Sequence, residues 1–193
     1  MIEGDGNTPL DDDEVAGLIP THITTQGELN EFEQANIVEG ERWARSQSSK
    51  DVLSPEFLRE VHRRMFDQTW TWAGRYRTSD KNLGVYWAEI PTAMQDLCDN
   101  TRAQLDEHAY PVDEAAVRFH YGLVRIHPFP NGNGRHARVV TDALLATDGY
   151  DRFVWGSRDL RTVGAVREEY IAALQAADAH DFGPLFRFLG IER

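Results

Sequence analysis

The sequence predicts an all-α domain that carries one small β-hairpin. Apolar residues recur at three- and four-residue spacing through most of the chain, which is the pattern of amphipathic helices. One short segment, residues 82–90, is β-prone and interrupted by a glycine, which favours a hairpin. With 193 residues, 41% of them hydrophobic, the chain is long enough to bury one core.

Each helix is expected from its own start and stop signals. Residues 1–27 lack clear periodicity and are expected to form an extended arm, followed by a helix from about 27 to 46. Ser54 and Pro55 predict the start of the next helix, because serine caps a helix and proline favours its first position. Further helices are expected after Pro91, Pro111, Gly134, Asp159 and Pro184.

The composition argues against several classes of protein. A net charge of -12 disfavours nonspecific nucleic-acid binding, which requires a broad basic surface. No window approaches the roughly 20 apolar residues of a membrane span, and the acidic N-terminus lacks the features of a signal peptide. Cys98 is the only cysteine, so no intrachain disulfide can form. We therefore expect a soluble cytoplasmic protein that binds neither nucleic acid nor membrane.

The segment of residues 127–138 carries the strongest functional signal. Two glycines flank Asn133 at the point where one helix is expected to end and another to begin. Backbone N–H groups at such a helix start can bind an anion, and Asn133 can add a side-chain donor. Arg135 and Arg138 are three residues apart, so both can reach the same polyphosphate from one helical face. The segment therefore predicts a binding site for nucleotide phosphates.

His127 is the best candidate for a catalytic base. It precedes Pro128 on the loop that faces the expected phosphate site. An imidazole titrates near neutral pH and can accept the proton of an attacking hydroxyl group. A structural role is the commoner one for a single histidine, and only the neighbouring phosphate site favours the catalytic interpretation.

Residues 127–138 resemble the signature of the Fic (Fic/Doc) family, His-Pro-Phe-x-x-Gly-Asn-Gly-Arg-x-x-Arg. The resemblance runs from about Leu53 to the C-terminus and includes Trp-Ala-Gly-x-Tyr-Arg at residues 72–77. It implies a Fic-type helical bundle with a β-hairpin flap in residues 52–193, preceded by an arm and an inhibitory helix in residues 1–51. The whole chain also resembles the bacterial subgroup called mobile mystery protein B.

The resemblance implies a protein adenylyltransferase that moves AMP from ATP to a Ser, Thr or Tyr hydroxyl group of a target protein, with Mg²⁺. His127 would be the base, and the flap would hold the target segment by backbone pairing. The residues implied to bind the nucleotide are Gly132, Asn133, Gly134, Arg135 and Arg138. The residues implied to form the flap are Asn82, Leu83, Gly84, Val85, Tyr86 and Trp87.

Asn131 departs from the family pattern, in which Asp or Glu commonly stands before the first glycine and binds Mg²⁺. An amide oxygen can bind a hard cation but contributes no negative charge. Mg²⁺ is therefore expected to bind weakly at Asn131 and to depend mainly on the phosphates of ATP.

Glu39 is the residue expected to inhibit the enzyme. Five residues at three- and four-residue spacing would share one inward face: Leu29, Phe32, Asn36, Glu39 and Trp43. Many Fic proteins carry an inhibitory helix with the pattern Ser/Thr-x-x-x-Glu-Gly/Asn, and residues 35–40 resemble it except at Ala35. The resemblance implies that Glu39 pairs with Arg138 and blocks ATP binding. A solvent-exposed position at the edge of the stripe is the alternative for Glu39.

Other functions stay open at this stage. A Fic-type phosphotransferase would move the γ-phosphate instead, and the same site could remove AMP from a modified protein. A catalytically idle regulator is also compatible with the acidic charge, a blocking Glu39 and the neutral Asn131. The resemblance to mobile mystery protein B suggests a helix-turn-helix companion protein and a toxin–antitoxin-like setting. The sequence indicates neither the target nor the oligomeric state.

The histidines do not have the spacing of a metal site. His120, His127 and His136 are seven and nine residues apart, and no His-Glu-x-x-His motif is present. His120 shares the apolar stripe of its helix and is expected in the core, whereas His136 is expected on the surface.

Overall fold

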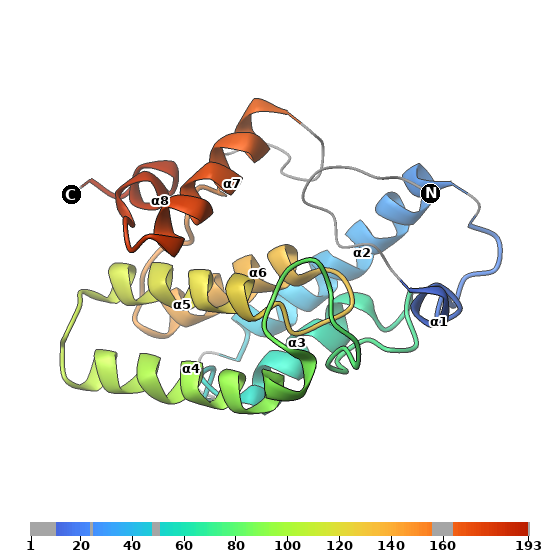
Figure 1. The fold of residues 1–193 in the computed structure, drawn as a ribbon, viewed down its shortest axis with the longest axis horizontal. Helices are drawn as coiled ribbons and strands as arrows, with labels where there is room; N and C mark the ends of the chain where they lie inside the picture. Colours follow the sequence, from blue (N-terminus) through green and yellow to red (C-terminus); the bar gives the residue numbers. More distant parts are fainter. Residues whose placement is uncertain (1–10, 24, 48–50, 156–163, 193) are drawn as a thin grey trace.

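The computed structural model describes residues 11–23, 25–47, 51–155 and 164–192, and within these ranges it is helical and contains no strand (Figure 1). The helices are α1 (Asp12–Val15), α2 (Gln26–Arg45), α3 (Pro55–Phe66), η1 (Trp87–Glu89), α4 (Ile90–Asp106), α5 (Val112–Ile126), α6 (Asn133–Thr147), α7 (Ala165–Asp178) and α8 (Gly183–Phe188). The expected all-α class is confirmed. None of these helices is both long and apolar enough to span a bilayer.

The antiparallel pair α5 and α6 lies at the centre of the molecule (Figure 1). Helix α4 packs against α5, and α2 and α3 pack together and against α6, while α7 and α8 pack on each other beside α5. Leu58, Met94, Leu123 and Leu144 come from four different helices and are almost completely buried in the shared core. The loop between α5 and α6 is therefore held in place from several sides.

Local sequence signals begin the helices close to where they were expected. Ser54 accepts a hydrogen bond from the Phe57 N–H, and Pro55 is the first residue of α3. Thr25 and Glu28 form a reciprocal capping box, in which each side chain bonds to the backbone of the other residue, at the start of α2. Asp159, where the last long helix was expected to begin, lies outside the described residues.

The N-terminal arm was expected to be extended, but its described part also contains a short helix. This helix, α1, begins with a capping box between Asp11 and Glu14. Leu18 then forms an antiparallel bridge with Trp70. Lys81 is almost buried and pairs with both acidic residues, at 2.8 Å from Asp11 and 2.6 Å from Glu14. The acidic start of the chain therefore packs onto the segment that precedes the expected flap.

Helix α2 buries a different face from the one expected. Its buried residues are Glu33, Ile37, Gly40 and Ala44. The prediction that Glu39 points inward is wrong, because its side chain is 75% exposed and pairs with Arg42 at 3.2 Å. At Gly40 a Cβ would lie only 2.7 Å from Met65, so α2 approaches α3 through small residues. Hydrophobicity alone did not indicate this face, because Ile37 is its only large apolar residue, whereas Leu29, Phe32 and Trp43 lie beside it and are only partly buried.

The expected β-hairpin is absent from the described residues. Residues 82–86 form a bent segment that leads into η1. Gly84 has a φ of 102°, and the Val85 carbonyl accepts a hydrogen bond from the Arg77 side chain rather than from a neighbouring strand. The segment is thus held by a side chain, which hydrophobic patterning cannot indicate.

The sequence predicted the burial of His120 correctly but not that of His136. His120 lies in the core, as expected, with its Nε2 atom 2.8 Å from the Tyr170 hydroxyl group. His136 was expected on the surface, but it is buried and its Nε2 atom lies 2.8 Å from the Leu58 carbonyl oxygen. The reason is tertiary, because the face of α6 that carries His136 packs against α3.

Candidate active site

His127 lies at the C-terminal end of α5, at the start of a turn that we call the histidine turn (residues 127–130). Its N–H still donates to the Leu123 carbonyl at 3.1 Å, but its φ of 54° is left-handed. Proline at position 128 disfavours continuation of the helix, because its ring clashes with a preceding helical residue. The backbone therefore reverses at the candidate base and leads directly into the segment before α6.

The imidazole of His127 is neutral at physiological pH. Burial lowers its pKa to about 4, and the positive charge of Arg77 acts in the same direction. A hydrogen bond with the backbone of Val124 acts in the opposite direction and favours the protonated ring. A neutral ring is the form that can accept a proton from a hydroxyl group.

The side chain of Asn133 holds the loop rather than pointing into the expected phosphate site. Its Oδ1 atom accepts from the Phe129 N–H at 2.9 Å, and its Nδ2 atom donates to the Phe129 carbonyl at 2.8 Å. Phe129 is fully buried and stacks on His62 with ring centroids 3.7 Å apart. One N–H of the Asn133 amide is therefore engaged within the loop, and a phosphate contact by its side chain stays a prediction.

The two glycines have different physical tasks. Gly132 has a φ of 78°, and a Cβ there would lie 2.5 Å from the Phe66 ring. Gly134 lies in the first turn of α6, where a Cβ would meet no described atom within 4 Å. No described side chain caps this helix at Gly132. The start of α6 thus presents backbone N–H groups beside open space, which is the geometry of an anion site.

Arg135 is paired with a carboxylate that comes from another helix. Its guanidinium forms an ion pair with Glu33 of α2 and lies over the Phe66 ring, 5.0 Å from the centroid. Glu33 is only 3% exposed and also accepts a hydrogen bond from the Trp70 indole at 2.8 Å. Sequence reasoning missed Glu33, although its spacing from Ile37 and Gly40 was the available signal.

Arg138 has other neighbours. Burial, together with the nearby charge of Arg138, lowers the pKa of His120 to about 3. The same charge opposes the effect of burial on Tyr170, whose pKa burial raises to about 12. Arg138 thus lies toward α5 and α7, whereas Arg135 contacts α2 and α3.

The expected flap, which we call the flap segment (residues 82–87), lies directly against the histidine turn. A Cβ at Gly84 would be 2.8 Å from the His127 Cβ, and the Val85 N–H donates to the Ile126 carbonyl at 3.3 Å. Three large side chains of this segment are exposed: Leu83, Tyr86 and Trp87. The structure therefore brings together the candidate base and an exposed surface that a partner could contact.

Arg77 joins the flap segment to the histidine turn and was not singled out from the sequence. Its Nε atom donates to the His127 carbonyl at 2.8 Å, and one Nη atom donates to the Ser79 carbonyl at 2.8 Å. The other Nη atom donates to the Val85 carbonyl. A single buried side chain therefore contacts both parts of the candidate site.

Both carbonyl oxygens of Asn131, one in the side chain and one in the backbone, take part in hydrogen bonds. Its Oδ1 atom accepts from the Gly132 N–H at 2.6 Å, and its carbonyl lies 3.1 Å from the Nε2 atom of His62. The Nδ1 atom of His62 accepts from the Gly74 N–H at 2.9 Å, so the ring is protonated at Nε2 and donates to Asn131. Within the described part of the chain, no three His, Cys, Asp or Glu residues form a metal-binding group.

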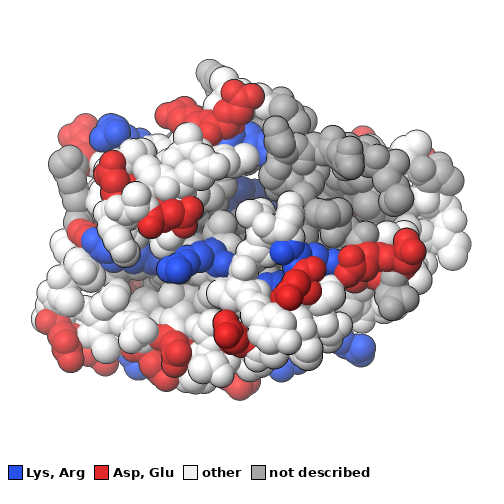
Figure 2. All heavy atoms as spheres, in the orientation of Figure 1, with Lys and Arg blue, Asp and Glu red and all other residues white. Residues whose placement is uncertain are grey.

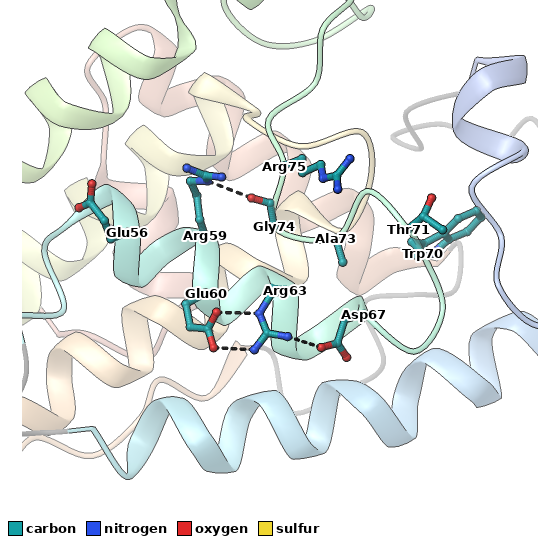
Figure 3. A pocket seen from close by; sticks show the side chains of 10 residues that line it. All are labelled: Glu56, Arg59, Glu60, Arg63, Asp67, Trp70, Thr71, Ala73, Gly74 and Arg75. Carbon is teal, nitrogen blue, oxygen red and sulfur yellow. Dashed lines mark hydrogen bonds and ion pairs between the residues drawn. The ribbon is translucent and has the colours of Figure 1, made fainter.

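A groove of about 540 Å³ lies along α3, outside the candidate site (Figure 3). Its charged residues largely pair with one another, because Arg63 lies 2.7 Å from Glu60 and 2.5 Å from Asp67. Gly74 lines this groove and also donates to His62. The groove is therefore linked to the loop before α6 but does not contain His127.

The surface charge fits a local anion site on an acidic protein. On the face shown in Figure 2, basic side chains form a band across the middle, at the level of α5 and α6 in Figure 1, and acidic side chains border it. A local concentration of basic side chains therefore coexists with the net charge of -12.

Comparison with known proteins connects this site with one family. Residues 52–145 match the model of the Fic/DOC family. The chain is 31% identical to protein adenylyltransferase Fic from Nematostella vectensis, over 74% of this chain and 33% of the relative. It is also 31% identical to protein adenylyltransferase fic-1 from Caenorhabditis elegans, over 72% of this chain and 27% of that protein. The chain thus spans about a third or less of these curated relatives.

Solved structures share the same fold. The N-terminal Fic domain of a VirB-translocated Bep effector protein from Bartonella quintana superposes with a TM-score of 0.71 at 18% identity, covering 92% of both chains. BepC from Bartonella tribocorum, solved with bound AMPPNP, superposes with a TM-score of 0.70 at 17% identity, covering 94% of this chain and 98% of that one. Residues 52–145 thus form a domain of the Fic/DOC family, and the chain shares the fold of solved Fic domains.

Proposed function

We propose that this protein is an adenylyltransferase that moves AMP from ATP to a Ser, Thr or Tyr hydroxyl group of a target protein. The observation that carries the proposal is a neutral, buried His127 next to the uncapped and open start of α6. The relatives named as protein adenylyltransferases support the reaction type, and the related structure with bound AMPPNP supports a nucleotide ligand.

In the proposed reaction, the hydroxyl oxygen of the target forms a bond to the α-phosphorus of ATP while the bond to pyrophosphate breaks. The neutral imidazole of His127 accepts the hydroxyl proton. The backbone N–H groups at the start of α6 stabilise the charge on the phosphates, together with Arg135 and Arg138. The flap segment orients the target so that its oxygen lies in line with the breaking bond.

We propose that Mg²⁺ accompanies ATP and that Asn131 contributes at most a weak, neutral ligand. Bound Mg²⁺ would offset negative charge on the phosphates. The Asn131 amide oxygen already accepts the Gly132 N–H at 2.6 Å, so only one of its two lone pairs is left for a cation. The phosphates of ATP and water would supply the other ligands.

We propose that Glu33 inhibits the enzyme by occupying Arg135, and that residues 1–51 regulate the catalytic unit of residues 52–193. The carboxylate of Glu33 is buried against Arg135 and is held there by the Trp70 indole. An ATP phosphate that needs Arg135 must compete with this carboxylate. Glu39, the residue first implied, points to solvent and serves as the natural comparison.

The test compares Glu33→Gln with Glu39→Gln and with wild type, using α-labelled ATP, Mg²⁺ and a cell lysate. Glu33→Gln keeps an acceptor for Trp70 but removes the charge that holds Arg135. We expect labelling of protein to rise by about tenfold or more in Glu33→Gln, the size of a typical coupling between two sites. Glu39→Gln should match wild type, and His127→Ala in the Glu33→Gln protein should abolish labelling.

Four outcomes would contradict these proposals. Equal labelling in Glu33→Gln and wild type would overturn inhibition by Glu33, and a rise in Glu39→Gln alone would restore the residue first implied. Mass spectrometry of a labelled protein should detect AMP, whereas a phosphate group would indicate a phosphotransferase. Absence of ATP binding by calorimetry in both proteins would favour an idle regulator.

A further inference from the structure

We propose that Arg77 is a positioning residue that couples the flap segment to the histidine turn, so that a target held by the flap has a set position relative to His127. This inference rests on the proposed function, because it gives His127 and the flap segment their roles. In this proposal the buried side chain of Arg77 aligns the target hydroxyl group with His127.

The contacts of Arg77 come from both structures that have to be aligned. Its side chain is 0% exposed, and its Nε atom donates to the carbonyl of His127 itself at 2.8 Å. An Nη atom donates to the carbonyl of Val85 in the flap segment. The backbone N–H of Arg77 also donates to the Pro128 carbonyl at 2.9 Å. Displacement of Arg77 would therefore move the flap segment and the histidine turn relative to each other.

The shape of the guanidinium explains why arginine is needed at this position. Its donors form a planar fork, which here reaches carbonyl groups of His127, Ser79 and Val85 at once. A lysine ammonium carries the same charge on a single atom and cannot span these three oxygens. The Asp80 carboxylate lies 3.7 Å from the guanidinium and is 58% exposed, so carbonyl oxygens provide most of the compensation for burial.

Gly84 shows how closely the two parts fit. A Cβ at this position would lie 2.7 Å from an Nη atom of Arg77, 2.8 Å from the His127 Cβ and 2.9 Å from the Ile126 carbonyl oxygen. The flap backbone therefore touches the guanidinium and the candidate base without an intervening side chain. The Arg77 guanidinium would therefore position both a target aligned along this backbone and the base, His127.

Arg77 also influences the chemistry of the base directly. Its positive charge disfavours protonation of His127 and adds to the effect of burial on the His127 pKa. The Val124 backbone of α5 acts in the opposite direction, and Asp80 faces the guanidinium from the segment before the flap. Geometry and charge can therefore be separated by two substitutions, one that keeps the charge and one that removes it.

The experiment uses Arg77→Lys and Arg77→Met in the Glu33→Gln protein, with Arg59→Lys as the matched control. Arg59 donates to a loop carbonyl, that of Gly74, at 3.0 Å and lies over the Tyr76 ring, and among the described residues no hydrogen bond joins its side chain to the histidine turn. NMR titration with labelled histidine measures the His127 pKa, and the Gly84 amide signal reports on the flap segment. Transfer of labelled AMP is measured against ATP concentration and against dilution of a cell lysate.

Arg77→Lys should leave the His127 pKa unchanged, shift the Gly84 signal and lower transfer by about a hundredfold, as expected for misplaced reactants. The KM for ATP should stay unchanged, because the nucleotide site does not involve Arg77. Arg77→Met should add an upward shift of the His127 pKa. Arg59→Lys should match its parent in all of these measurements.

A purely structural role would have a different signature. Arg77→Lys would then lower the melting temperature while leaving the Gly84 signal, the lysate dependence and the transfer rate of the folded protein at parental values, and this result would overturn the inference. If the Glu33→Gln parent transfers no AMP, the proposed function fails instead. The NMR comparison then still decides the coupling, because unchanged Gly84 and His127 signals in both Arg77 variants contradict it.

Discussion

Alanine at the two glycines of the phosphate loop should affect stability in opposite directions. At Gly132 alanine must adopt a φ of 78°, which costs a residue with a side chain about 1–2 kcal/mol. Its Cβ would also lie 2.5 Å from the Phe66 ring, an overlap of the kind that costs about 1–3 kcal/mol. Gly132→Ala should therefore lower the free energy of unfolding by about 2–5 kcal/mol.

Gly134→Ala should leave the protein at least as stable as wild type. The position belongs to the first turn of α6, and a Cβ there meets no described atom within 4 Å. Alanine favours a helix over glycine by up to about 1 kcal/mol, so the free energy of unfolding should stay the same or rise. The new methyl group would nevertheless occupy the open space where we place a phosphate, and ATP binding should weaken by tenfold or more, about 1.4 kcal/mol.

Urea unfolding followed by circular dichroism measures the first effect, and calorimetry of ATP with Mg²⁺ in the Glu33→Gln protein measures the second. The informative result is the combination, because a stable Gly134→Ala protein that does not bind ATP separates the site from the fold. Wild-type affinity in Gly134→Ala would refute the placement of the phosphate. Wild-type stability in Gly132→Ala would refute both the left-handed backbone at Gly132 and its close approach to the Phe66 ring.

Two further predictions concern charge. Asn131→Asp should increase Mg²⁺-dependent transfer in the Glu33→Gln protein, because a carboxylate can keep the bond to the Gly132 N–H and adds a charged ligand. An unchanged Mg²⁺ dependence of the rate would remove this residue from the metal site. Burial lowers the pKa of His136 to about 4 in the folded protein, against about 6.5 in the unfolded chain. Above pH 6.5 the ring is neutral in both states, and the free energy of unfolding is then not reduced by its protonation. About 3 kcal/mol of the free energy of unfolding should be lost as the pH falls from 6.5 to 4, because the unfolded chain binds the proton first. Urea unfolding at several pH values should show a shallower acid dependence in His136→Gln, and parallel curves would contradict this account.

Local signals predicted much of the fold. Ser54 and Pro55 mark the start of α3 because a cap and a preset φ act within one turn. The sequence also indicated the loop between α5 and α6, because a His-Pro junction and two glycines restrict the backbone locally. The hairpin expected at residues 82–90 failed, because a β-prone segment becomes a strand only when another strand pairs with it.

By itself, the sequence determined the helical class, the position of most helix starts and the glycine-containing loop between α5 and α6 with His127 beside it. Only the tertiary structure decided that Glu33 rather than Glu39 meets a motif arginine, because small residues set the rotation of α2 against α3. It also decided that Arg77 joins the flap segment to the histidine turn. The physical reason is the range of the interactions: caps, prolines and glycines act on adjacent residues, whereas the partner of a buried charge depends on how distant segments pack.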